Sequence, residues 1–174
     1  MSFWIHAFCN ESVASVTTQE LTSGIAERLK SLTYLFCPDK EENPDVVLAR
    51  LKIEDRSTDG TFRVFLIYYR SDSPLFIRVD RIDDARGSIE EFDGDVLAHR
   101  SEPAIARIRQ MLKVAKEQVS FCLKADDVDS MGFPLSIAAA SYLVKRVGGV
   151  IQSGNYSWMV PSGKEVDILA EFSA

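Results

Sequence analysis

Apolar and polar residues alternate with a period of two at the start of the stretch 119–160. Val119, Phe121 and Leu123 alternate with polar or small residues, which predicts a strand with one buried face. The polar run 126–130 then interrupts the pattern, and residues 135–144 are apolar on nearly every side, as in a buried helix. Gly148-Gly149 ends that helix, because glycine adopts the left-handed cap without strain.

A hairpin is predicted after this helix, with strands at 150–152 and 156–160 around Ser153-Gly154-Asn155. The stretch therefore has the order β-α-β-β. The last residues, Glu165 to Ala174, predict a short strand or a short helix.

The first half of the chain predicts a similar order with one additional strand. Residues 3–9 form a strand with apolar residues on both faces, which indicates cover on both sides or an interior position. Thr17 and Glu20 form a capping box, and leucine and isoleucine then recur at helical spacing up to Leu32. Three further strands are predicted at 47–54, 62–69 and 75–79, with turns at Asp59-Gly60 and Asp72-Ser73-Pro74.

Residues 80–95 are the most polar stretch and predict a crossover loop, with at most one helical turn. A helix follows from Ser101, with Pro103 in its first turn. The expected fold is α+β, with two layers, a mostly antiparallel sheet and about three helices. We expect one domain over residues 1–174, in which halves 1–82 and 101–174 are joined by the acidic crossover 83–100.

Composition excludes some classes of function. The 174 residues carry a net charge of −6, which argues against nucleic-acid binding and against attraction to an anionic membrane surface. Cys9, Cys37 and Cys122 lack paired Cys-x-x-Cys spacing, as is typical of reduced thiols in a cytoplasmic protein. The first residues do not resemble a signal peptide, and no apolar run is long enough to span a bilayer.

Asp126, Asp127 and Asp129 are candidate ligands for a hard cation such as magnesium or calcium. Their spacing does not match the EF-hand loop. The alternative is structural, because Asp127, Asp129 or Ser130 can cap the following helix. No cofactor is predicted.

Catalytic groups are not predicted from this sequence. His6 lies between Trp4 and Phe8 and is expected to be a hydrogen-bonded core histidine, while His99 lies in a polar segment. Ser120 and Cys122 lie within a strand, whereas nucleophiles are usually held at turns or helix N-termini beside a base. Gly148-Gly149 follows a helix, whereas phosphate-binding loops precede one.

Two groups of residues are candidates for contact with a partner protein. The first is an acidic surface in the crossover, which suits a basic partner unless it is only a solvated loop. The second is the aromatic pair of the hairpin, which is a binding patch if exposed and core if it faces a helix. The acidic candidates are Asp83, Asp84, Glu90, Glu91, Asp93 and Asp95, and the aromatic ones are Tyr156 and Trp158.

The run Asp129-Ser-Met-Gly-Phe-Pro, the Ala-rich helix and Gly148-Gly-Val-Ile-Gln with Ser157-Trp158 resemble a C-terminal pattern of small bacterial cytoplasmic proteins. Candidates for immunity proteins of toxin systems are among them. The resemblance covers about a quarter of the chain and implies a bacterial, non-enzymatic, protein-binding role.

The leading functional hypothesis is therefore a cytoplasmic module that binds a basic protein, of the immunity type. Two alternatives remain. One is a small-ligand or metal-binding domain, or an enzyme, with a pocket near 126–129. The other is a homo-oligomeric structural protein, such as a homodimer paired through a sheet edge or the Trp158 hairpin.

Overall fold

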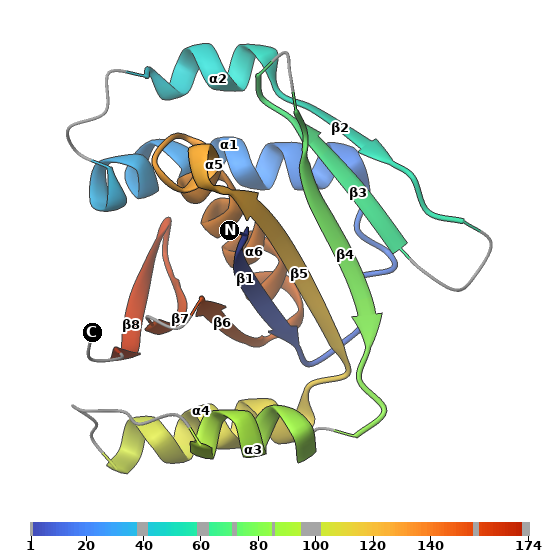
Figure 1. Cartoon of the computed structure of the whole chain (residues 1–174), viewed down its shortest axis with the longest axis vertical. Helices are drawn as coiled ribbons and strands as arrows, with labels where there is room; N and C mark the ends of the chain where they lie inside the picture. The colour runs from blue at the N-terminus through green and yellow to red at the C-terminus, as the bar shows by residue number, and fades with distance from the viewer. Residues whose placement is uncertain are drawn as a thin grey trace.

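The computed structural model describes residues 2–37, 42–58, 63–70, 73–84, 86–94, 102–154 and 157–171. In this part of the chain, eight strands form one sheet in the order β2-β3-β4-β5-β1-β6-β7-β8, with every neighbouring pair antiparallel (Figure 1). The predicted α+β class with an antiparallel sheet is confirmed. The strands are β1 (Ser2–Cys9), β2 (Lys52–Asp55), β3 (Arg63–Tyr68), β4 (Leu75–Arg81), β5 (Glu117–Lys124), β6 (Gly149–Ser153), β7 (Ser157–Ser162) and β8 (Glu165–Glu171).

Helices are more numerous than the sequence predicts: the described residues contain six, against an expectation of about three. The longest helix begins at the predicted capping box. The Thr17 hydroxyl accepts from the Glu20 N–H at 3.1 Å, and the Glu20 carboxylate accepts from the Thr17 N–H at 2.9 Å. The helices are α1 (Thr18–Phe36), α2 (Pro44–Arg50), α3 (Arg86–Gly94), α4 (Glu102–Val114), α5 (Ala125–Val128) and α6 (Gly132–Val147).

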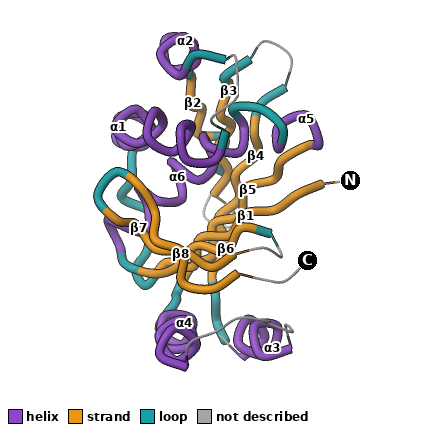
Figure 2. Tube along the Cα trace, turned by 90° about the vertical axis from the view of Figure 1, so that its left-hand side faces the viewer, coloured by secondary structure: helices purple, strands orange, loops and turns teal. Residues whose placement is uncertain are grey.

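Helices α1 and α6 lie side by side and cover one face of the sheet (Figure 2). The main core lies between these helices and the strands. Ala138, Ala139 and Ala140 of α6 are fully buried, and their small side chains allow close approach of neighbouring elements. Close approach also occurs between the helices, because a Cβ atom at Gly24 of α1 would lie 2.2 Å from the Tyr142 ring of α6.

The opposite face carries helices over only part of the sheet. Phe92 of α3 and Leu112 of α4 share a second core with Trp158, Phe8 and Val150 of the sheet. This core lies at the β6-β7-β8 end. The expected two-layer arrangement therefore describes the β3-β4-β5 region, whereas α3 and α4 cover the other face beside β6, β7 and β8 (Figures 1 and 2).

The predicted halves are interleaved rather than side by side. β1 comes from the first half but pairs with β5 and β6 of the second. The segments from β1 to β4 and from β5 to β8 share the element order β-α-α-β-β-β, with α3 and α4 between them. In the first half, however, the three-strand meander runs from the sheet edge inward, while in the second it runs from the centre outward.

Two predicted elements are wrong. Residues 47–50, expected to begin the strand 47–54, belong instead to α2, because the Asn43 side chain accepts from the Asp45 N–H at 2.9 Å and Pro44 suits the first helical turn. The crossover contains the nine-residue helix α3 instead of a single turn. Its apolar Ile89 and Phe92 pack on the second core and stabilise it.

The structure also describes the C-terminal segment and the helix that was predicted from Ser101. The C-terminal segment is a strand, β8, and Pro103 lies in the first turn of α4 as expected. The turn at Asp59-Gly60, together with Asp72, Ser101 and Asn155, lies outside the described residues. No helix in the described ranges is long and apolar enough to cross a membrane.

Gly149 is expected to be essential for the pairing of β6 with β1. Its φ is +132°, and an added Cβ would lie 1.9 Å from the backbone oxygen of Phe8. Gly149→Ala should therefore lower the free energy of unfolding by more than the 1–3 kcal/mol or so expected for a strained backbone alone.

Gly163→Ala provides the matched control, measured by denaturant titration. Gly163 also has positive φ, +62°, but nothing lies within 4 Å of its added Cβ. It should lose only about 1–2 kcal/mol. Equal losses in the two variants would contradict the steric explanation.

Candidate functional site

Strand β1 has a different environment on each face. Ile5, Ala7 and Cys9 lie in the main core and are fully buried. On the opposite face, exposure falls along the strand, from 39% at Trp4 to 4% at Phe8. The covered part of this face thus ends within β1, and the remaining part is open to solvent.

One row of side chains crosses the open part from β1 to β2. The strand registers place Trp4 beside Cys122, Cys122 beside Phe76, Phe76 beside Leu66, and Leu66 beside Glu54. Trp4 and Phe76 are each 39% exposed. The solvated face of an antiparallel sheet usually carries polar residues at such positions. This row is instead apolar except at its β2 end.

A second row lies beside the first and is mostly polar. Val64, Arg78, Ser120 and His6 follow one another across β3, β4, β5 and β1. We refer to the uncovered part of the sheet as the open sheet face. It comprises Trp4, His6, Val64, Leu66, Phe76, Arg78, Asp80, Gln118, Ser120 and Cys122.

His6 is held in one orientation at the centre of this face. Its Nδ1 atom lies 2.9 Å from the Gln118 amide nitrogen and 3.0 Å from the Ser120 hydroxyl. An amide nitrogen only donates, so this contact favours the neutral tautomer in which Nδ1 accepts and Nε2 carries the proton. Burial, reinforced by nearby Arg78, lowers the pKa of His6 below its ordinary value of 6.5, although Asp80 acts in the opposite sense.

Three ion pairs lie on and beside the open face. Arg78 donates to Asp80 at 2.7 Å. On β2 and just beyond it, Glu54 accepts from Lys52 and from Arg56, both at 2.6 Å. Lys52 and Arg56 share the single carboxylate of Glu54, so these groups leave the face with a small excess of positive charge.

Nucleophilic catalysis is poorly supported by the His6–Ser120 contact. Ser120 is 3% exposed and lies in β5, which pairs on both sides with β4 and β1. The backbone N–H groups of such a strand are used within the sheet and cannot form an oxyanion hole. The exposed aromatic row is better suited to binding another surface than to a reaction.

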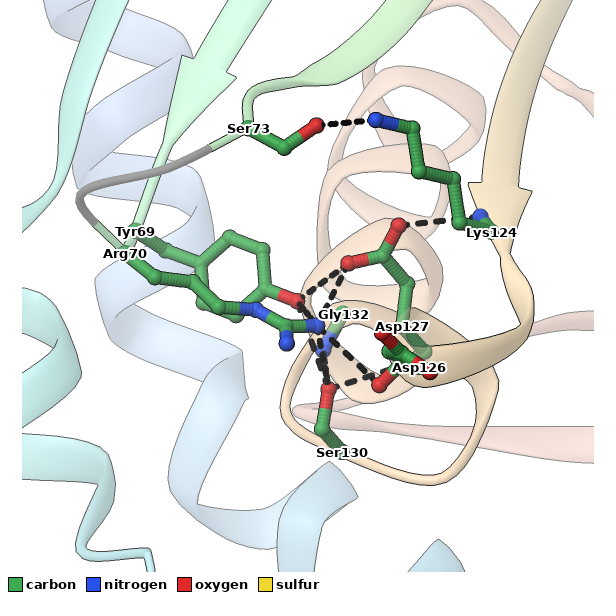
Figure 3. A network of polar contacts seen from close by, with 8 residues as sticks. All are labelled: Tyr69, Arg70, Ser73, Lys124, Asp126, Asp127, Ser130 and Gly132. Atoms are coloured by element: carbon green, nitrogen blue, oxygen red, sulfur yellow. Dashed lines mark hydrogen bonds and ion pairs between the residues drawn. The ribbon is translucent and has the colours of Figure 1, made fainter.

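The predicted metal-ligand segment 126–129 instead forms an ion-pair network (Figure 3). The Asp127 carboxylate accepts from the Tyr69 hydroxyl and from Arg70, both at 2.6 Å, and from the Lys124 N–H at 2.9 Å. Asp127 therefore caps α5, whereas the sequence offered it, Asp129 or Ser130 as the cap of the longer helix α6, which has no side-chain cap hydrogen bond. Asp127 also joins the β3 end to the α5 segment.

Arg70 binds this segment at more than one point. It donates to the Asp126 carbonyl at 3.0 Å and to the Ser130 hydroxyl at 2.9 Å, and it also contacts the Tyr69 hydroxyl. Burial and the Asp127 contact raise the pKa of Tyr69 to about 12. Across the described ranges, no three His, Cys, Asp or Glu side chains are grouped as metal ligands.

The acidic candidates lie at and within α3. Asp83 and Asp84 are exposed and pair with Arg81 at 3.2 Å and Arg86 at 3.4 Å. Glu90 is exposed on α3, whose backbone also includes Glu91 and Asp93. Asp95 lies outside the described residues, as does His99.

Trp158 belongs to the second core. Of the two alternatives for this residue, an exposed binding patch or a core position, the structure supports the core position. It is 1% exposed, and its ring lies 5.8 Å from Phe8 and 5.2 Å from Phe92. In this arrangement a partner cannot contact it. Its hairpin neighbour Tyr156 lies outside the described residues.

Sequence reasoning missed the residues that distinguish the open face. Trp4, Leu66 and Phe76 occur at strand positions where alternation with core residues predicts polar side chains. This departure from alternation is the feature of the sequence that could have identified the open face. Comparison with protein-family models, curated proteins and solved structures finds no match.

Stability should fall as the pH falls below 6.5, in part through His6. Its lowered pKa means that the unfolded chain binds this proton at a higher pH than the folded protein does. Its stabilising contribution is therefore present above pH 6.5 and is lost at lower pH. His6→Gln should reduce the loss in unfolding free energy between pH 7.5 and 5.5, measured by denaturant titration. An unchanged pH dependence would contradict the expectation.

Removal of the Asp127 carboxylate should destabilise the protein strongly. Asp127→Ala leaves Tyr69 and Arg70 without their shared acceptor. Loss of one partner from a buried pair costs about 3–5 kcal/mol. Because the Arg70 side chain is 36% exposed, we expect about 2–3 kcal/mol. Asp126→Ala, which changes an exposed side chain in the same turn, should stay within about 0.5 kcal/mol. Similar losses in both variants would contradict the proposed role of the network.

Proposed function

We propose that this protein is a non-enzymatic protein-binding module and that the open sheet face is its docking surface. The observation that supports the proposal is the apolar row formed by Trp4, Cys122, Phe76 and Leu66 on an otherwise solvated face. Contiguous exposed apolar residues bordered by polar ones are typical of interaction sites.

The composition of this face also favours binding to a protein. Aromatic residues and arginine are enriched among the residues that dominate interface energies. Here Trp4 and Phe76 are rigid, partly exposed rings, while Arg78 and His6 provide hydrogen-bond donors beside them. The sheet backbone fixes the position of every one of these side chains, which limits the entropy lost on binding.

A small-ligand function has weaker support. An apolar cavity between α1, α6 and the sheet has a volume of about 10 Å³, enough for at most one water molecule. Near 126–129, the Asp127 carboxylate is already occupied by Tyr69, Arg70 and Lys124.

Self-association through the β8 edge is also less favourable. An antiparallel pair of β8 strands centred on Ile168 would place Glu165 of one copy beside Glu171 of the other, with Asp167 nearby. Acidic residues on an edge strand oppose such pairing. The resemblance of residues 129–158 to immunity-type bacterial proteins favours a different, protein partner in the cytoplasm.

Phe76→Ser should weaken partner binding about tenfold or more, as expected for an aromatic residue at the centre of an interface. Binding is measured by immobilising the protein, adding extract of its native cells and quantifying retained proteins by mass spectrometry. Partner retention should fall without a matching change in the melting temperature.

Ile168→Ser is the matched control, because Ile168 is also a partly exposed apolar strand residue, 47% exposed, but lies on the β8 edge. It should retain the partner. Equal retention by both variants, or equal loss, would contradict docking at the open sheet face.

A further inference from the structure

We infer that the open sheet face binds an acidic segment of a partner protein, with large apolar side chains at its centre and carboxylates on both sides of them. This inference rests on the proposed function, because it specifies the chemistry of the partner at the same face. The sign of the charge is opposite to that of the basic partner predicted from the composition of the chain.

Basic side chains lie on both sides of the apolar row. On one side are Lys52 of β2 and Lys124 of β5, and on the other side are Arg56, which follows β2, and Arg78 of β4. Each of them is two residues along its strand from the row, a distance of about 7 Å. The apolar centre of the face is therefore flanked by cations.

The cations of this face are more exposed than the carboxylates beside them. The Lys52 and Arg56 side chains are 69% and 62% exposed, whereas the Glu54 side chain that they share is 21% exposed. Arg78 is likewise 53% exposed, and its partner Asp80 is 28% exposed. A surface that approaches the open face therefore meets positive charge first, even where each cation has a carboxylate beside it.

Lys124 adds a cation that pairs with no carboxylate among the described residues. Its ammonium group donates to the Ser73 hydroxyl at the end of β5 (Figure 3). With Lys124, the described face carries four basic and two acidic side chains, an excess of two positive charges. The whole chain, in contrast, has a net charge of −6.

An acidic segment complements this pattern. Its large apolar side chains would pack on Trp4 and Phe76 at the centre of the face. Carboxylates on either side of them would reach the flanking cations. A basic segment would instead bring like charges against the most exposed groups of the face, which opposes its binding.

The acidic crossover does not reverse the sign of this surface. Among its described carboxylates, Asp83 and Asp84 each pair with an arginine, whereas Glu90 is exposed. Helix α4 packs beside α3 and exposes Arg107 and Lys113. The described residues next to the open face therefore add no excess of negative charge.

Two other occupants fit this face less well. A nucleic-acid strand needs several cations for its phosphates, whereas Lys52, Arg56 and Arg78 already hold carboxylates that would repel those phosphates. A second copy of the chain, placed face to face, would bring the exposed cations of both copies together.

The test uses a photo-crosslinking phenylalanine in place of Phe76, with irradiation in the native cells. The crosslinked segment is identified by mass spectrometry. We expect a protein segment with at least one large apolar side chain and a net negative charge. The same photo-reactive residue at Ile168 of β8 should not capture it, because Ile168 lies on the distant sheet edge.

A second measurement uses a synthetic peptide of the captured segment and the purified protein. The double variant Lys52→Gln and Lys124→Gln should weaken peptide binding about tenfold at low salt, and it should reduce the salt dependence of the dissociation constant. The matched variant Lys145→Gln and Lys164→Gln removes the same total charge from exposed positions outside the open face. It should leave binding unchanged. Melting temperatures verify that both variants fold.

An acidic segment whose affinity depends on Lys52 and Lys124 supports the inference. Capture of a neutral or basic protein segment, capture of a second copy, or equal affinities of the two double variants overturns the inference. A neutral or basic segment of another protein still leaves protein binding at this face intact. Capture of a nucleic acid, or no capture at Phe76, overturns both the inference and the proposed function.

Discussion

The position of β1 between β5 and β6 is the constraint on which the rest of the structure depends. The strand joins the two halves of the chain into one sheet, and both of its faces are used. Ile5 and Ala7 anchor the main core, whereas Phe8 begins the second. The part of the face covered by α3 and α4 ends near His6. The same strand therefore contributes to both cores and exposes Trp4 to solvent.

The Asp127 network joins β3 to the α5 segment at the end of the sheet away from helices α3 and α4 (Figure 1). Lys124 is the last residue of β5 and Asp127 follows it, while Tyr69 and Arg70 follow β3. β4 lies between these two strands in the sheet. The network therefore ties the end of β3 to the segment that leads into α6.

The sequence predicted the elements with a clear period and missed those that depend on tertiary contacts. The strands around Phe121 and Ile77 alternate regularly between apolar and polar residues. The helix from Thr18 has apolar residues at helical spacing and a capping box at its start. Residues 47–50 fit period two as well as a short helix, and the Asn43 cap with Pro44 after it distinguishes the two. Helix α3 is polar by composition and is stabilised by two apolar side chains that meet a core distant in sequence.

The candidate site was harder to predict than the fold. Alternation indicates which residues share a face but does not indicate where a covering helix ends. Trp4 and Trp158 lie on the same face of the sheet, yet one is 39% exposed and the other 1% exposed. Acidic residues near 83–95 were recognisable from composition, whereas the apolar row became visible only through the strand registers.

The central place of β1 also has a consequence for how the chain folds during synthesis. β1 is made before the residues with which it pairs, such as Phe121 and Ser153 opposite Ile5, which lie more than a hundred residues later in the chain. The β2-β3-β4 meander can form locally, whereas the sheet centre must wait for nearly the whole chain. Such non-local pairing makes folding slow, because a long loop must close before its contacts form. Until that step, the apolar faces of β1 lack the strands and helices that cover them in the folded protein.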